Sequence, residues 1–132
     1  MKQWSRIVID VVPHNQQLYE TVGDYHLDTN GDLHIYVSEL GDPRYNFLVA
    51  IHELVEAGLV DDRNISENSI SSFDKLFEDL RPEGNTDEPG DELAAPYRKE
   101  HCTATGIERI MASELNVAWK EYDKTVNDLS QS

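Results

Sequence analysis

The chain has 132 residues and a mass of 15.1 kDa, which is the size of one domain and leaves no room for two independent cores. Hydrophobic residues make up 39 % and charged residues 28 %, so we expect a folded chain, and no apolar run approaches the roughly 20 residues that span a bilayer. The formal charge of −15 would repel a phosphate backbone, which argues against direct nucleic-acid binding. A surface this acidic suits solubility, cations or a basic protein partner.

The single cysteine and the N-terminal residues bear on the compartment. Cys102 is the only cysteine, which excludes an intramolecular disulfide and fits a reducing environment. The first residues lead into an alternating segment and not into the apolar stretch of a signal peptide. The sequence therefore predicts a cytoplasmic protein that does not associate with a membrane.

The first third of the chain has the alternation that is typical of strands. Residues 4–12 place Ile7, Ile9 and Val11 on one face. Residues 24–38 indicate a hairpin, because Asn30-Gly31 is a favoured two-residue type I′ turn. Such a turn would set His26 opposite Ile35 and carry His26 toward the core, within reach of a site.

Helical patterns occupy the remainder of the chain. The first expected helix covers residues 45–59, with Asp42 as N-cap and Pro43 in the first turn, and it is apolar nearly all round. Further helices are expected over 66–80, capped by Ser66, over 97–115, and around Trp119 and Tyr122, with a long acidic loop at 81–96 that could gate access. We predict one α+β domain over residues 1–132. It has a small N-terminal antiparallel sheet followed by three to four helices, and its tail frays from about residue 125.

Polar side chains in the middle of the first helix need a reason. His52-Glu53-Leu54-Val55-Glu56 lies between apolar flanks, and an unpaired buried carboxylate costs several kcal/mol. Positions 52 and 56 lie one above the other on a helix, and position 53 is three residues from 56. The three side chains therefore project from one sector of the helix.

This segment resembles the active-site helix of zincin-type metallopeptidases, whose signature is His-Glu-x-x-His. The resemblance implies that His52 is a metal ligand and that Glu53 is the general base that activates a metal-bound water. Glu56 stands where the family has its second histidine. A carboxylate can bind zinc, and a site richer in oxygen also admits manganese or iron.

A metal site needs a third ligand from another segment. On the expected helix over 97–115, His101, Ala104, Glu108 and Met111 share one sector. If this sector faces the first helix, His101 completes a ligand set with His52 and Glu56. Glu108 would then support a ligand or replace one.

A series of short motifs runs through most of the chain after residue 45. They are His52-Glu53-x-x-Glu56-Ala57, Phe73-Asp74, Glu88-Pro89-Gly90-Asp91, Ala95-Pro96-Tyr97, Glu100-His101, Ile107-Glu108-Arg109 and Trp119-x-x-Tyr122. With these motifs the chain resembles a family of small phage or prophage proteins with an HExxE helix. The resemblance implies a location in the host cytoplasm and brings no activity with it.

The residues thus favour a metal-dependent hydrolase that acts on a peptide, an amide or another small substrate. We expect its ion to be zinc, held by His52, Glu56 and His101, with Glu53 as the catalytic base. Two alternatives stay open: a metal that is only structural, and a buried His/Glu network paired with Arg98 or Arg109 in an acidic accessory or binding protein. His-Asp phosphohydrolases have a similar spacing of metal ligands on a helix, but they are all-helical, whereas this chain is expected to contain strands. A calcium-binding loop over residues 28–39 would need glycine at its sixth position, which is Leu33 here.

Overall fold

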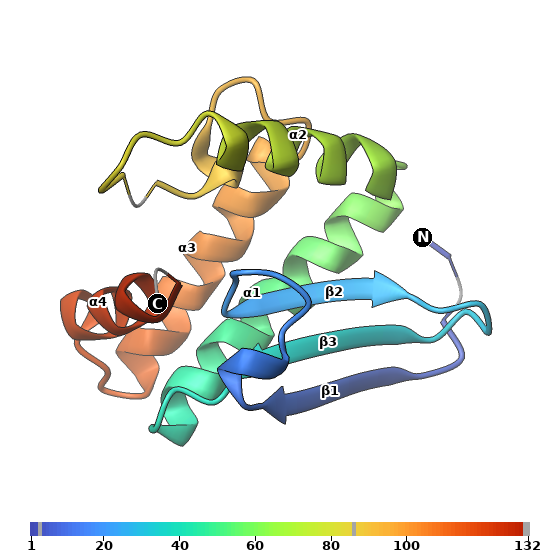
Figure 1. Cartoon of the computed structure of the whole chain (residues 1–132). Coiled ribbons are helices and arrows are strands. Elements are labelled where there is room, and N and C mark those ends of the chain that lie inside the picture. The colour runs from blue at the N-terminus through green and yellow to red at the C-terminus, as the bar shows by residue number, and fades with distance from the viewer. Residues whose placement is uncertain (3, 86, 131–132) are drawn as a thin grey trace.

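The computed structural model describes residues 1–2, 4–85 and 87–130, and it confirms the α+β class. A three-stranded sheet comes first and the helices follow it (Figure 1). The elements are β1 (Ile7–Val12), a 3-10 turn η1 (His14–Gln16), β2 (Gly23–Leu27), β3 (Leu33–Ser38), α1 (Pro43–Asp62), α2 (Glu67–Asp79), a 3-10 turn η2 (Pro89–Asp91), α3 (Arg98–Glu114) and α4 (Trp119–Ser130).

The sheet is mixed, with the strand order β1-β3-β2. The β2–β3 hairpin is antiparallel, as expected, but β1 runs parallel to β3, so the prediction of a wholly antiparallel sheet is wrong for this strand. The alternation of apolar and polar residues indicates that a segment is a strand, but it does not indicate which other strand this segment pairs with. The last residue of β1 pairs with Ser38, and the first residue of β2 pairs with Val37, so both lie at the same end of β3. Residues 13–22 therefore cross that end of β3, and β3 lies between β1 and β2.

The hairpin register also differs from the expectation by one residue. Gly31 has a φ of 80°, whereas Asn30 is not among the positive-φ residues of the described chain, so the type I′ turn does not form. Tyr25 pairs with Ile35 and lies on the buried face, while His26 pairs with His34 on the opposite face and stacks on its ring. The prediction that His26 reaches a site is therefore wrong, because a shift of one residue exchanges the two faces of a strand.

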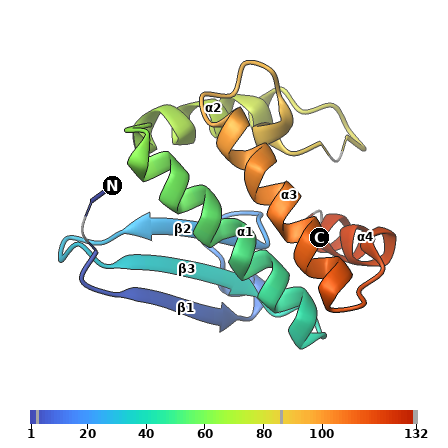
Figure 2. The same ribbon diagram turned by 180° about the vertical axis from the view of Figure 1, so that it is seen from behind.

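Helix α1 covers one face of the sheet, and α3 packs beside α1 (Figure 2). The predicted caps form: the side chain of Asp42 accepts a hydrogen bond from the backbone N–H of Arg44 (2.9 Å), and Ser66 accepts one from Ser69 (3.1 Å). The apolar core lies between sheet and helix, and its fully buried members include Leu33, Ile35, Val37 and Leu48. Among the described helices, none has the length and apolar character that a membrane span requires.

The later helices differ in how they are covered. Helix α2 has an apolar stripe but buries none of its residues, and Leu76 and Leu80 are largely exposed. Helix α4 continues to Ser130 and packs back on the core through Tyr122, which is fully buried. Cys102 on α3 is exposed.

Candidate metal centre

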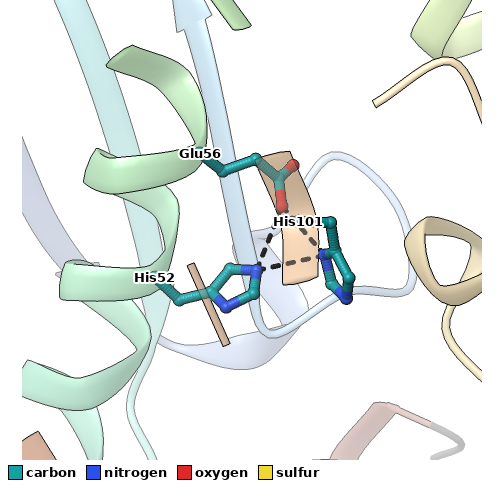
Figure 3. A group of neighbouring side chains, drawn as sticks. All are labelled: His52, Glu56 and His101. Atoms are coloured by element: carbon teal, nitrogen blue, oxygen red, sulfur yellow. Dashed lines mark hydrogen bonds and ion pairs between the residues drawn. The ribbon is translucent and has the colours of Figure 1, made fainter. Parts of the chain in front are cut away.

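Three of the predicted site residues meet between α1 and α3, and we call them the central group: His52, Glu56 and His101 (Figure 3). Glu56 Oε2 lies 3.1 Å from His52 Nε2 and 2.9 Å from His101 Nδ1. The two facing ring nitrogens are 3.3 Å apart. Each of the three residues is at most 9 % exposed. Two segments almost 50 residues apart thus bring two nitrogens and one oxygen to one buried point.

Helical spacing explains why the group forms. His52 and Glu56 are one turn apart on the buried side of α1. On α3 the buried positions include His101, Ala104 and Glu108, which repeat every three or four residues, so this stripe faces α1 as expected.

A second layer of hydrogen bonds orients His52. Its Nδ1 lies 2.8 Å from Glu108 Oε1, and the hydroxyl of Tyr122 donates to the other oxygen of Glu108. A carboxylate that accepts the proton of one ring nitrogen leaves the lone pair of the other nitrogen free for a metal. Glu108 is therefore placed to support the ligand His52 and not to replace it.

Tyr25 belongs to the site although the sequence did not indicate it. Its hydroxyl donates a 3.2 Å hydrogen bond to Glu56 Oε1, the oxygen that points away from the histidines. The hairpin register decides this placement, because Tyr25 reaches the buried face only when it pairs with Ile35. A hairpin turn that is one residue longer than the expected two-residue turn gives this register and places Tyr25 on the buried face.

Glu53, the predicted base, lies on the β2 side of α1 and is partly buried. A Cβ added to Gly23 would stand 2.6 Å from Glu53 Oε1, so the glycine provides the space that this carboxylate occupies. Within residues 1–2, 4–85 and 87–130, Glu53 has no hydrogen bond or ion pair. Burial, helped by the charge of Glu56, raises its pKa well above the usual value. Glu53 is thus an uncommitted carboxylate beside the central group.

The central group is strongly coupled. Burial alone would raise the pKa of Glu56, but the hydrogen bonds from His101 and His52 lower it to about 2. Burial opposes charge on the imidazoles, yet the contact with Glu56 and the charge of Glu88 raise the pKa of His101 to about 10, and Glu108 and Glu56 raise that of His52. Without a metal, the protonated rings of His52 and His101 therefore share the carboxylate of Glu56. A bound metal would replace the protons on the two facing ring nitrogens.

The donor set fits a divalent ion. In a tetrahedral zinc site with bonds of roughly 2.0–2.1 Å, neighbouring ligand atoms are about 3.3 Å apart. The three separations of 2.9, 3.1 and 3.3 Å need only a small opening to reach that value. Two histidines and one glutamate are also a set that catalytic zinc centres use, with a fourth position free for water or substrate.

In the part of the chain that the structure describes, no arginine forms an ion pair with the central group. Arg98 donates to the backbone oxygen of Asp91, and Arg109 stacks on the ring of Trp119. In the described chain, the buried acid paired with an arginine in this region is Glu100, which lies 2.6 Å from Arg63. The predicted network with Arg98 or Arg109 is therefore not what surrounds Glu56.

A second set of similar residues, which we call the hairpin group, consists of Asp28, Asp32 and His34. Its acids already have partners: Asp32 pairs with Arg6 at 3.1 Å, and Asp28 accepts two backbone N–H groups and lies 2.8 Å from His34. Glu39, the last position of the calcium-loop alternative, binds Gly41 and Asn46 instead. The calcium interpretation is therefore not supported here.

A comparison of the chain with protein-family models, curated proteins and solved structures finds no match. The resemblances to zincins and to phage proteins therefore stay predictions. The geometry and chemistry of the site are therefore the basis for a proposed function.

Proposed function

We propose that the chain is a metal-dependent hydrolase with a zincin-like centre that acts on peptide or amide bonds. One observation carries this proposal: two imidazole nitrogens and a carboxylate oxygen converge within 3.3 Å of one another in a buried place where lysine and arginine of the described chain form no ion pair with them. Zinc suits this set best, and manganese or iron is chemically permitted.

The metal and the protein residues have separate tasks. When bound, a divalent ion supplies Lewis acidity to a substrate carbonyl and to a water molecule. Glu108 keeps a proton on His52 Nδ1, so Nε2 stays available as a ligand. Tyr25 holds one oxygen of Glu56, which leaves the other oxygen directed at the two rings.

Glu53 is the base in this proposal. It forms no hydrogen bond or ion pair in the described structure, and burial raises its pKa, so it holds a proton more readily than an exposed carboxylate does. Glu53 would take a proton from the attacking water and return it to the leaving amine. The acidic residues around the centre, among them Glu88 and Asp91, disfavour an anionic substrate.

The test combines metal analysis with hydrolysis. The protein loaded with zinc is assayed on a mixture of fluorogenic peptides, alongside the metal-free protein and the variants Glu53→Gln and Glu121→Gln. We expect about one tightly bound zinc, activity only in the loaded protein, and a loss of about 10²–10⁴-fold in turnover for Glu53→Gln with zinc retained. Glu121 is exposed on α4 and serves as the control. Metal binding with equal turnover in both variants would contradict the catalytic role of Glu53.

A second candidate is a metal-free structural network, and a specific observation favours it. Both oxygens of Glu56 and both oxygens of Glu108 already have hydrogen-bond partners. Such a network would stabilise a non-enzymatic acidic protein, and the surface charge would then serve a basic partner. Zinc that changes neither the melting temperature nor any measured turnover would favour this alternative.

A further inference from the structure

The outer side of His101 lies against the η2 turn, away from the central group. Gly90, in the middle of this turn, is buried, and a Cβ added to it would stand 2.4 Å from His101 Cγ. The backbone of η2 therefore touches the face of the imidazole, which only a glycine permits at this distance. This close approach brings Glu88, which precedes the turn, and Asp91, its last residue, to the edge of the ring.

Two carboxylates approach the outer nitrogen of His101. Nε2 lies 2.9 Å from Glu88 Oε2 and 3.3 Å from Asp91 Oδ1. His101 is only 5 % exposed, yet this buried Nε2 makes no hydrogen bond of acceptable geometry. The nitrogen thus has two carboxylate oxygens nearby but is not aligned for a hydrogen bond with either of them. Three potential ligand atoms lie within 4.8 Å of one another.

The charge at this outer group favours a cation. Among the described residues, no lysine or arginine forms an ion pair with Glu88 or Asp91, and the two carboxylates share the single imidazole of His101, so a net negative charge remains at the outer group even when that ring is protonated. Their side chains are 46 % and 57 % exposed, so an ion in solvent reaches their oxygens without any rearrangement of the core. Imidazole and carboxylate are ligands that zinc and manganese share.

We propose that His101 Nε2, Glu88 and Asp91 form a second divalent-cation position, outside the central group. It shares the ring of His101 with the proposed centre, which would use Nδ1, but its carboxylates are its own. When both positions are filled, the imidazole has released both ring protons to solvent. Because that release is costly and the carboxylates stay half exposed, the outer position is the weaker one, by at least about tenfold in dissociation constant.

Zinc titration with elemental analysis tests this proposal on the full chain. The variant Glu88→Gln/Asp91→Asn removes the outer carboxylates. The matched control Asp87→Asn/Glu92→Gln also removes two negative charges from this loop, but at exposed positions outside the group. We expect about two zinc ions per wild-type chain. The outer variant should lose the weaker ion and keep the tighter one, and the control should keep both.

The pattern of results separates this proposal from the proposed function. If the central group binds no ion, the wild type takes up one zinc, which His52→Ala keeps and the outer variant loses. If the outer position does not exist, the wild type takes up one zinc, which the outer variant keeps, and the proposal is overturned. A second zinc that the control loses as well, or that the outer variant keeps, also overturns it. Thermal melting of each metal-free variant checks that it is folded.

Discussion

The central group and the hairpin group contain the same kinds of side chain but differ in what surrounds them. In the hairpin group, Arg6 pairs with Asp32, and backbone N–H groups satisfy Asp28. In the central group, Glu56 contacts two imidazoles and a tyrosine, which would all remain in place around the proposed ion. Residue types alone therefore do not define a metal site. The partners that the acids already have decide whether a cation is needed.

Removing a ligand from either group gives the largest expected difference. His101→Ala or Glu56→Gln should weaken zinc binding by more than about 100-fold, because each leaves only two of three ligands. His34→Ala or Asp28→Asn should leave the tight site unchanged, since those side chains have partners of their own. Isothermal titration with zinc compares the four variants. An equal loss of zinc affinity for variants of both groups would contradict the proposed difference between the central group and the hairpin group.

A smaller effect is expected one layer further out, at Glu108. Glu108→Gln keeps the shape of the side chain but weakens its hold on His52 Nδ1. We expect zinc affinity to fall by about 10- to 100-fold. Glu114→Gln, at an exposed position on the same helix, is the matched control. An affinity that Glu108→Gln does not change would show that His52 needs no support from this carboxylate.

The close packing of Gly23 against Glu53 predicts a selective effect on turnover. In Gly23→Ala the new methyl group would overlap with Glu53 Oε1 and Val49, so the carboxylate must move. We expect turnover to fall by about tenfold, because a displaced base is out of reach of its proton, while zinc affinity stays the same. A parallel loss of zinc would show that the substitution disturbs the whole centre.

The pH dependence of stability should reverse when zinc is added. In the metal-free fold the pKa of His101 is raised to about 10 from its ordinary 6.5. The stabilisation from its charged form is therefore complete below pH 6.5 and is lost as the pH rises toward 10. Zinc competes with those protons, so the stabilisation that it adds should grow over the same range. Melting temperatures from pH 6 to pH 10, with chelator and with zinc, should show opposite trends, and parallel trends would contradict metal binding at His101.

The helices could be predicted from the sequence because their signals are local. Asp42, Pro43 and Ser66 mark the helix starts, and polar residues at helical spacing in an apolar segment indicated His52 and Glu56. The spacing of buried positions on α3 added His101. These features depend on neighbours three or four residues away, which a sequence shows directly.

The sheet and its contribution to the site could not be predicted in the same way. Whether β1 runs beside β2 or beside β3 depends on contacts between distant segments. The hairpin register depends on a turn longer by one residue, which brings Tyr25 inward in place of His26. The approach of Gly90 to His101 likewise follows from how the loop folds over α3, for which the sequence has no periodic signal.

A crystal structure of the zinc-loaded protein, with anomalous diffraction recorded at the zinc edge, tests the central claim most directly. We predict a strong peak about 2.0–2.2 Å from His52 Nε2, Glu56 Oε2 and His101 Nδ1, in a fold otherwise like that of Figure 1. A map without density at that point, in which the two rings still share the carboxylate of Glu56, would contradict it.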